Sequence, residues 1–299
     1  MNRDDLRVRL AAGVLVLDGA MGTQLIARGM KAGVCNDLLN VEQPHVVADV
    51  HRAYIQAGSD AVLTNTFGAN RFVLGRHGLA ERTWQINQAG AANARDAVDN
   101  GRYVLGDIGP CGDFLEPLGM LKPGDLRAAF AEQAEALVAG GVDGLIVETM
   151  TALDEASIVV EAALAAAAGR PVFASMSFDA AGGAFRTMMG VDVDSAVAAL
   201  VSLGVDAVGY NCGTATLDEY VELTRRVVAA VRKASPTVRV LAEPNAGKPE
   251  LVGDHAVYRV TAEQFAEAAA QICDLGVTII GGCCGTTPDL IAALATRVG

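Results

Sequence analysis

The chain has 299 residues, of which 52% are hydrophobic and 19% charged, so it contains enough apolar material for a sizeable globular core. Its formal net charge is −12. This acidity argues against proteins that bind nucleic acids or anionic membranes, because both classes need a basic surface; moreover, no run approaches the roughly 20 apolar residues of a membrane span.

The N-terminal segment does not resemble a secretory signal. Asp4 and Asp5 lie where a signal peptide carries positive charge, and the apolar run that ends at Leu17 is followed by Asp18 and Gly19 instead of a small-residue cleavage site. We therefore expect a cytoplasmic protein. In that compartment the six cysteines should be reduced thiols that are available to a metal or to catalysis.

The rest of the chain repeats one pattern, in which a helix ends at a glycine and a short apolar strand follows. The clearest copies are 57–63, 140–146, 203–208 and 275–280. The glycine suits the residue after a helix, and the uninterrupted apolar run suits a parallel strand buried on both faces. The predicted strands are 14–20, 61–67, 103–109, 144–150, 171–178, 207–212, 239–245 and 277–283. The predicted helices are 44–57, 82–98, 124–139, 153–168, 192–203, 217–234, 262–275 and 288–298.

Eight strands that alternate with eight helices predict a single-domain α/β protein, a (β/α)8 TIM barrel over residues 1–299. The alternative is an open doubly wound sheet, which should carry a phosphate-binding glycine loop after its first strand. The segment Asp18-Gly19-Ala20-Met21-Gly22-Thr23 does not match G-x-G-x-x-G, which favours the barrel.

In a barrel enzyme the active residues lie at the carboxyl ends of the strands. Seven of the eight predicted strands end in polar or cysteine residues: Asp18, Thr64-Asn65-Thr66, Asp107, Glu148-Thr149, Asn211-Cys212, Glu243-Pro244-Asn245 and Cys283-Cys284. Polar residues in buried strands need hydrogen-bond partners or a function. We take Asp18, Glu148 and Asn211 as candidate catalytic residues and Asn65 as a candidate substrate contact. The four histidines, His45, His51, His77 and His255, lie off the strand ends and are interpreted as surface or loop residues.

Three cysteines fall at one predicted rim, since Cys212 ends the sixth strand and the pair Cys283-Cys284 ends the eighth. Three thiolates suit zinc and leave its fourth tetrahedral position open, as in catalytic zinc sites. Neighbouring strand residues point to opposite faces, so the pair can share a metal only where the strand breaks, and the glycines around it allow such a break. The alternative is three buried free cysteines.

These motifs together resemble the homocysteine S-methyltransferase family. The matching pieces are Asp18-Gly19-Ala20-Met21-Gly22-Thr23, Thr64-Asn65-Thr66-Phe67, Val147-Glu148-Thr149, Asn211-Cys212 and Gly281-Gly282-Cys283-Cys284-Gly285. The segment 242–249 looks more like the homocysteine-binding domain of cobalamin-dependent methionine synthases than like the S-methylmethionine-dependent enzymes.

The resemblance implies a zinc ion held by Cys212, Cys283 and Cys284, with the sulfur of homocysteine as the fourth ligand. It also implies that Asp18 and Glu148 hold the ammonium group of the substrate. The backbone amides from Gly19 to Thr23 are candidates for its carboxylate, because glycine turns at strand ends often bind anions. The thiolate would then attack a donor methyl group and give methionine.

The sequence leaves the methyl donor open. We expect methylcobalamin, with a methyl group derived from 5-methyltetrahydrofolate, on a separate corrinoid protein, and S-methylmethionine or S-adenosylmethionine is the alternative. A different class of function, a barrel lyase or aldolase, would need a reactive lysine such as Lys248 or a histidine–carboxylate metal site. A non-enzymatic zinc-binding protein is a further alternative.

Overall fold

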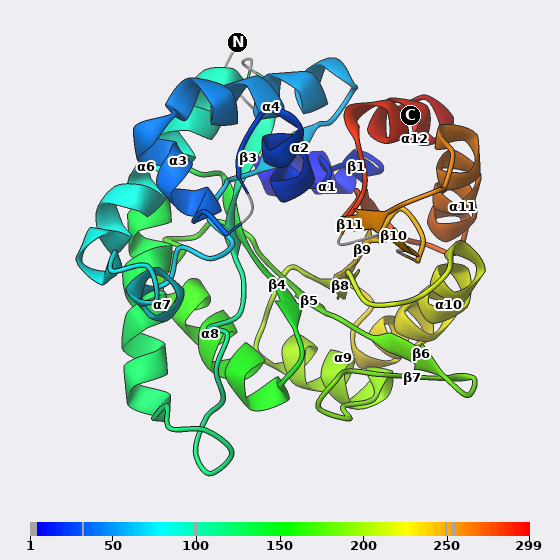
Figure 1. Ribbon diagram of the computed structural model, residues 1–299. Coiled ribbons are helices and arrows are strands. Elements are labelled where there is room, and N and C mark those ends of the chain that lie inside the picture. Colours follow the sequence, from blue (N-terminus) through cyan, green and yellow to red (C-terminus); the bar gives the residue numbers. More distant parts are fainter. Residues whose placement is uncertain (1–4, 32, 99–100, 249, 253–254) are drawn as a thin grey trace.

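The protein is a (β/α)8 barrel in which eight parallel strands are surrounded by helices (Figure 1). The structure, a computed structural model, describes residues 5–31, 33–98, 101–248, 250–252 and 255–299. The fold prediction is confirmed. Pro249, the last residue of the segment 242–249 discussed above, lies outside the described residues. Within them, no helix combines the length and the apolar character that crossing a membrane would require.

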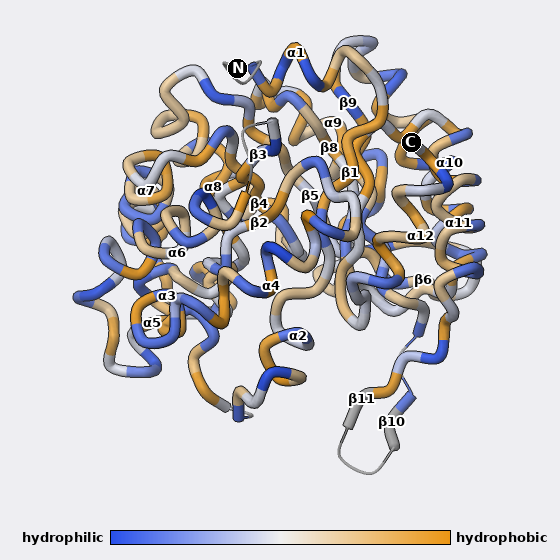
Figure 2. The backbone as a smooth tube through the Cα atoms, turned by 90° about the horizontal axis from the view of Figure 1, so that it is seen from above, coloured by the Kyte–Doolittle hydropathy of each residue, from blue (hydrophilic) through white to orange (hydrophobic). Residues whose placement is uncertain are grey.

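The barrel strands pair in the order β1-β12-β9-β8-β5-β4-β3-β2. Their bounds are β1 Leu15–Val16, β2 Ala61–Leu63, β3 Tyr103–Ile108, β4 Gly144–Met150, β5 Val172–Met176, β8 Ala207–Asn211, β9 Arg239–Glu243 and β12 Ile279–Ile280. Two hairpins, β6 Asp179–Ala181 with β7 Ala184–Arg186 and β10 Glu250–Val252 with β11 His255–Val257, lie outside the barrel sheet. In Figure 2 hydrophobic stretches, in orange, lie along central strands such as β1 and β4.

Helices connect the strands, and several begin with the local signals that their sequences provide. Thr216 and Thr261 each form a capping box with the residue three positions later, and proline occupies the first helical turn of α4, α7 and α12. The helices are α1 Leu6–Ala11, α2 Met21–Ala27, α3 Leu39–Glu42, α4 Pro44–Gln56, α5 Arg71–Gly75, α6 Thr83–Ala97, α7 Pro123–Ala139, α8 Leu153–Ala166, α9 Val193–Ser202, α10 Leu217–Ala234, α11 Ala262–Asp274 and α12 Pro288–Val298, with short 3-10 turns η1 Asn36–Leu38 and η2 Ala80–Arg82.

The repeated Gly-x-Asp sequence pattern has a structural role at the amino ends of the strands. In three copies the aspartate, Asp60, Asp143 or Asp206, accepts the backbone N–H of a residue on a neighbouring strand. Each also pairs with an arginine, such as Arg95 with Asp143. These contacts tie adjacent strands together at the end of the barrel opposite the predicted site.

The first and last barrel strands are shorter than predicted. Beyond Val16, the carboxylate of Asp18 accepts the N–H of Leu63, at 3.2 and 3.1 Å from its two oxygens, so a side chain takes the place of a backbone acceptor. Beyond Ile280 the chain turns through two glycines, Gly281 and Gly282, into the cysteine pair. The regular strands β1 and β12 therefore end before Asp18 and before the Cys283–Cys284 pair. The two hairpins and α1 lie in segments for which no element was predicted.

One interpretation of the histidines is wrong. His45 and His77 are exposed, as expected, but His51 is fully buried on α4, and neither of its ring nitrogens has a partner among the described residues. It follows Val47 by four positions and precedes Tyr54 by three, and both of these are fully buried, so all three lie on the core-facing side of the helix. The side chain of His255 is not among those described.

Candidate active site

The barrel interior is layered, and its top layer is polar. A compact apolar cluster fills the lower part, and Leu6 and Leu10 of α1 belong to it. Because side chains alternate along a strand, residues two positions beyond these interior residues face the same way. Polar side chains follow the apolar ones by this spacing on four strands: Asp107 after Leu105, Glu148 after Ile146, Ser175 after Phe173 and Glu243 after Leu241. The apolar strands therefore end in a polar floor.

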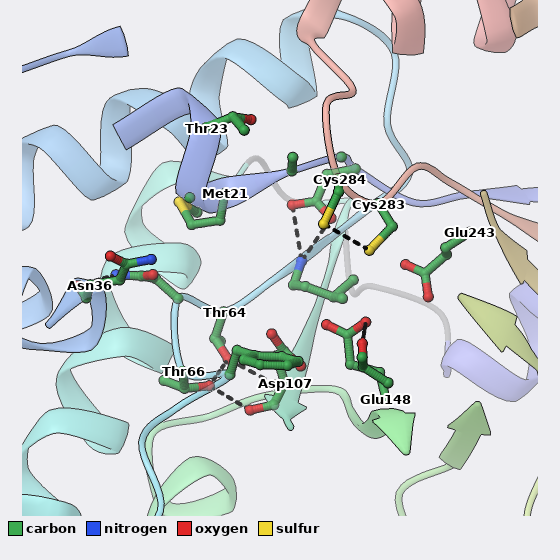
Figure 3. A pocket seen from close by; sticks show the side chains of 18 of the residues that line it. Met21, Thr23, Asn36, Thr64, Thr66, Asp107, Glu148, Glu243, Cys283 and Cys284 are labelled. Carbon is green, nitrogen blue, oxygen red and sulfur yellow. Dashed lines mark hydrogen bonds between the residues drawn. The ribbon is translucent and has the colours of Figure 1, made fainter. Parts of the chain in front are cut away.

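A cavity of about 480 Å³ opens above this floor. Figure 3 shows Asp107 and Glu148 below Cys283 and Cys284, and Glu243 beside the cysteine pair. Among the described residues that line the cavity, five are acidic and none is Lys, Arg or His. Met21, Ile26 and Phe67 add apolar surface to the lining, and Phe67 is 41% exposed. The cavity is therefore suited to a small molecule that carries positive charge and an apolar chain.

The three predicted cysteines converge at this cavity. The Sγ of Cys212 lies 3.8 Å from that of Cys284, which is 4.0 Å from that of Cys283, and all three sulfurs lie within 4.8 Å of one another. Cys212 has a φ of +55°, and Gly285 after the pair has a φ of +78°. These left-handed residues turn the chain at the strand ends and bring the neighbouring cysteines to one point.

This spacing fits a zinc ion. Tetrahedral zinc with bonds of about 2.3 Å holds its sulfur ligands about 3.8 Å apart. In addition, Asn245 donates through Nδ2 to the carbonyl of Gly213 at 2.7 Å, while its buried Oδ1 has no partner among the described residues. The other cysteines, Cys35, Cys111 and Cys273, lie outside the cluster.

Hydrogen bonding among the thiols makes Cys212 the most acidic of the three. Donation from Cys283 and Cys284 lowers the pKa of the Cys212 thiol to about 3, whereas the hydrogen bond with Cys212 is the largest cause that raises the pKa of Cys284 to about 12. One thiolate is thus stabilised by two neighbouring S–H groups. All three thiols can ionise only if a cation offsets their negative charge, as a bound metal ion does.

Asn211 organises the polar floor. Its Oδ1 accepts the backbone N–H of Thr149 at 2.8 Å and the hydroxyl of Ser175 at 2.7 Å. Its Nδ2 donates to Glu148 and lies 3.7 Å from the Sγ of Cys283. Thr149, like Cys212, has a positive φ. Two residues with this uncommon backbone conformation thus flank the Asn211 network, as is typical of functional sites.

Four buried carboxyl groups lie close enough to influence one another: Asp18, Asp107, Glu148 and Glu243. Burial is the main reason that the pKa of Glu148 is raised to about 7 and that the pKa values of the other three lie well above their ordinary values. Their negative forms are poorly solvated, so an incoming cation would be strongly favoured. Asp107 and Glu243 were noted at strand ends but assigned no role.

The remaining candidate residues also line the cavity. Gly19 lies just before α2 and Thr23 within it, and the amide of Ala20 between them donates to Thr286 Oγ1 at 3.0 Å. At least one amide of that segment is therefore already used. Asn65 donates to the carbonyl of Asn36 at 2.9 Å, which joins the β2 end to η1. This contact gives Asn65 a structural role that its position in the sequence did not reveal.

A family model described as homocysteine S-methyltransferase matches residues 15–298. Methionine synthases of Mycobacterium tuberculosis and Mycobacterium leprae are 38% and 37% identical over 313 aligned positions, which cover 98% of this chain and 25% of each relative. The chain thus spans about a quarter of the length of these curated relatives. The metallated crystal structure of the homocysteine methyltransferase MmuM from Escherichia coli is 26% identical, with a TM-score of 0.79 and coverage of 98% of this chain and all of that one.

Proposed function

The chain belongs to the homocysteine S-methyltransferase family, and is thus a methyltransferase; from this premise we propose that it methylates the thiol of homocysteine to give methionine. One observation carries the proposal: three cysteine sulfurs at zinc-like spacing lie beside a cavity whose lining is acidic and contains no described basic residue. We assign zinc to Cys212, Cys283 and Cys284, and we treat residues 1–299 as one homocysteine-binding barrel domain in the cytoplasm, where thiols stay reduced.

Bound zinc would supply a Lewis acid that keeps the substrate sulfur deprotonated at neutral pH. The chain's own residues orient the rest of the substrate. Asp18 and Glu148 attract the ammonium group, and free amides between Gly19 and Thr23 are the candidate contacts for the carboxylate. Asn211 fixes Glu148 and contacts Cys283, so it connects the residue that attracts the ammonium group with the cysteines that hold the metal.

The reaction is a displacement at the methyl carbon. The homocysteine thiol first gives up its proton to solvent water, and a sulfur lone pair then forms the new S–C bond. The bond between the methyl group and the donor breaks at the same time, and its electron pair leaves with the donor. The lining residues Met21 and Phe67 provide apolar surface where the methyl group can approach without competing water.

We propose that the methyl group arrives as methylcobalamin on a separate corrinoid protein and derives from 5-methyltetrahydrofolate. Similarity to about a quarter of each mycobacterial methionine synthase supports this donor. The alternative is a small sulfonium donor, S-methylmethionine or S-adenosylmethionine. Five acidic residues in the cavity lining favour this second candidate, because they would attract the positively charged sulfonium group that carries the methyl group.

A Schiff-base aldolase has little support in this site. Lys248, the lysine nearest a strand end, is exposed and is not among the described residues that line the cavity. A non-enzymatic zinc-binding role does not account for the acidic cavity beside the cysteines.

A donor panel tests the proposal. The zinc-loaded protein is incubated with L-homocysteine and, separately, methylcobalamin, S-methylmethionine or S-adenosylmethionine, and methionine is quantified. Turnover with one donor that disappears in Cys283→Ala, together with one zinc per chain in the parent protein, is the expected result. Methionine formation that ignores this substitution would refute the proposed zinc mechanism, and absence of turnover with every donor would refute the activity.

A further inference from the structure

The two acidic residues that have no assigned role, Asp107 and Glu243, differ from the other two in one respect. One oxygen of each, Asp107 Oδ1 and Glu243 Oε2, is buried without a hydrogen-bond partner among the described residues. Asp18, by contrast, accepts the N–H of Leu63, and Glu148 accepts from the amide of Asn211. A buried acceptor without a partner loses solvation and gains nothing in return.

Both residues lie in the cavity lining and are almost fully buried, with exposed fractions of 6% for Asp107 and 3% for Glu243. Figure 3 shows Glu243 beside Cys283, and Asp107 farther from the cysteine pair and near Thr66. Glu243 ends β9, which is hydrogen-bonded between β8 and β12, the two strands that lead into Cys212 and into the Cys283–Cys284 pair. A ligand whose sulfur binds the cysteine site would therefore have its other groups close to this carboxyl.

The chemistry of the expected substrate matches this arrangement. The ammonium group of an amino acid has three N–H donors, whereas a carboxyl group has none once it is ionised. No lysine, arginine or histidine is found among the described lining residues, so the protein's own lining supplies no positive partner for these oxygens. An incoming ammonium group would satisfy them and restore the solvation lost on burial.

We infer that Asp107 and Glu243 determine the specificity of the cavity for thiols that carry an α-ammonium group, by supplying hydrogen-bond acceptors in addition to those of Asp18 and Glu148. This inference rests on the proposed function, because it takes homocysteine as the substrate. The polar floor then favours ligands with an amino group. A thiol acid without this group leaves two buried acceptors unpaired and binds weakly.

Binding measurements on the zinc-loaded protein test the inference without turnover. Isothermal titration compares L-homocysteine with 4-sulfanylbutanoate, which keeps the thiol and the carboxylate but lacks the ammonium group. Glu243→Gln and Asp107→Asn preserve side-chain size and remove the charge. Thr278→Val is the control, because its hydroxyl is also buried without a partner among the described residues but lies just before β12, at the amino end of the strand.

We expect each acidic variant to bind L-homocysteine about tenfold to a hundredfold more weakly, the range for losing a hydrogen bond to a charged group. Binding of 4-sulfanylbutanoate should change less than about threefold, and Thr278→Val should match the parent with both ligands. Equal weakening of both ligands, or no weakening of either, would overturn the inference. Zinc content and melting temperature, measured on each variant, identify a variant that has lost the site as a whole.

The same titrations separate this inference from the proposed function. If the parent protein binds L-homocysteine and makes methionine, but the variants bind both ligands as the parent does, only the role of Asp107 and Glu243 is wrong. If the parent protein does not bind L-homocysteine, the proposed function itself is wrong, and the inference fails with it.

Discussion

The side-chain amide of Asn211 donates a hydrogen bond to the carboxylate of Glu148, from the end of β8 to the end of β4. This contact joins two strands that are separated by β5 in the barrel. The Oδ1 atom of Asn211 accepts hydrogen bonds from Thr149 and Ser175. Cys212 follows Asn211 directly, so the position of one proposed metal ligand depends on the same network. Asn211 therefore connects the carboxyl group of Glu148 with the cysteine cluster.

Asn211→Asp changes few atoms but should damage the site severely. The new oxygen would replace the N–H donor that faces the carboxylate of Glu148. Two buried hydrogen-bond acceptors would then face each other without a donor between them. We expect a loss of about 2–3 kcal/mol in the free energy of unfolding and at least about a tenfold loss of homocysteine affinity. Urea unfolding and isothermal titration measure these changes.

Asn87→Asp is a matched control for this substitution. Asn87 is also fully buried, on α6, and its amide donates to two backbone carbonyls away from the cavity. The control should lose stability but keep homocysteine affinity. If Asn87→Asp weakens homocysteine binding as much as Asn211→Asp does, Asn211 has no special connection to the site.

Removal of one cysteine ligand should abolish metal binding while the barrel stays folded. Cys212→Ala leaves two sulfurs, and the apolar interior of the barrel lies below this rim and does not include it. We expect less than about a tenth of the parent zinc content and at least about a hundredfold less turnover, with a native circular dichroism spectrum. Cys273→Ala, on α11 and outside the cluster, should retain zinc. Global unfolding of Cys212→Ala would instead indicate that the cysteines are structural.

The buried His51 should make the protein sensitive to mild acid. Burial lowers the pKa of His51 from its ordinary value of 6.5 to about 3, so between these values only the unfolded chain binds the proton. The free energy of unfolding should consequently fall as the pH drops below about 6.5, by up to about 1.4 kcal/mol per pH unit.

His51→Leu removes this titration and the two unpartnered ring nitrogens. The stability difference between this variant and the parent should widen as the pH falls from 7 to 5, measured by urea unfolding at each pH. His77→Leu, at an exposed position, should not alter the pH profile. Parallel profiles for His51→Leu and the parent would show that His51 is not responsible.

Asp143 should contribute to stability and not to activity. It accepts the N–H of Val104 at 2.7 Å and pairs with Arg95, and its side chain is only 9% exposed. Asp143→Asn should lower the free energy of unfolding by about 2–4 kcal/mol and leave kcat/KM at low temperature within about twofold of the parent, because this end of a barrel does not carry the active site. The exposed pair Arg297–Glu267 supplies the control: Glu267→Gln should change stability by less than about 1 kcal/mol. A large fall in kcat/KM for Asp143→Asn would contradict this division of roles.

The sequence by itself determined the barrel and the strand ends at which its site lies. Strict alternation of buried apolar runs with helical segments is a local property of the chain, and eight such units close a parallel barrel. The i, i+2 alternation that brings Asp107, Glu148 and Glu243 onto one floor is equally local. The burial of His51 is also local in origin, because its helical spacing from Val47 and Tyr54 places it on the core-facing side of α4.

Only the tertiary structure decided which of these residues meet. The convergence of Cys212 with Cys283 and Cys284 depends on the left-handed turns after β8 and β12, whose geometry strand periodicity does not specify. The hub role of Asn211 and the unpartnered oxygens of Asp107 and Glu243 depend on contacts between residues dozens of positions apart. Hydrogen-bond partners and burial are properties of three-dimensional packing, so they could be assigned only once the strands lay side by side.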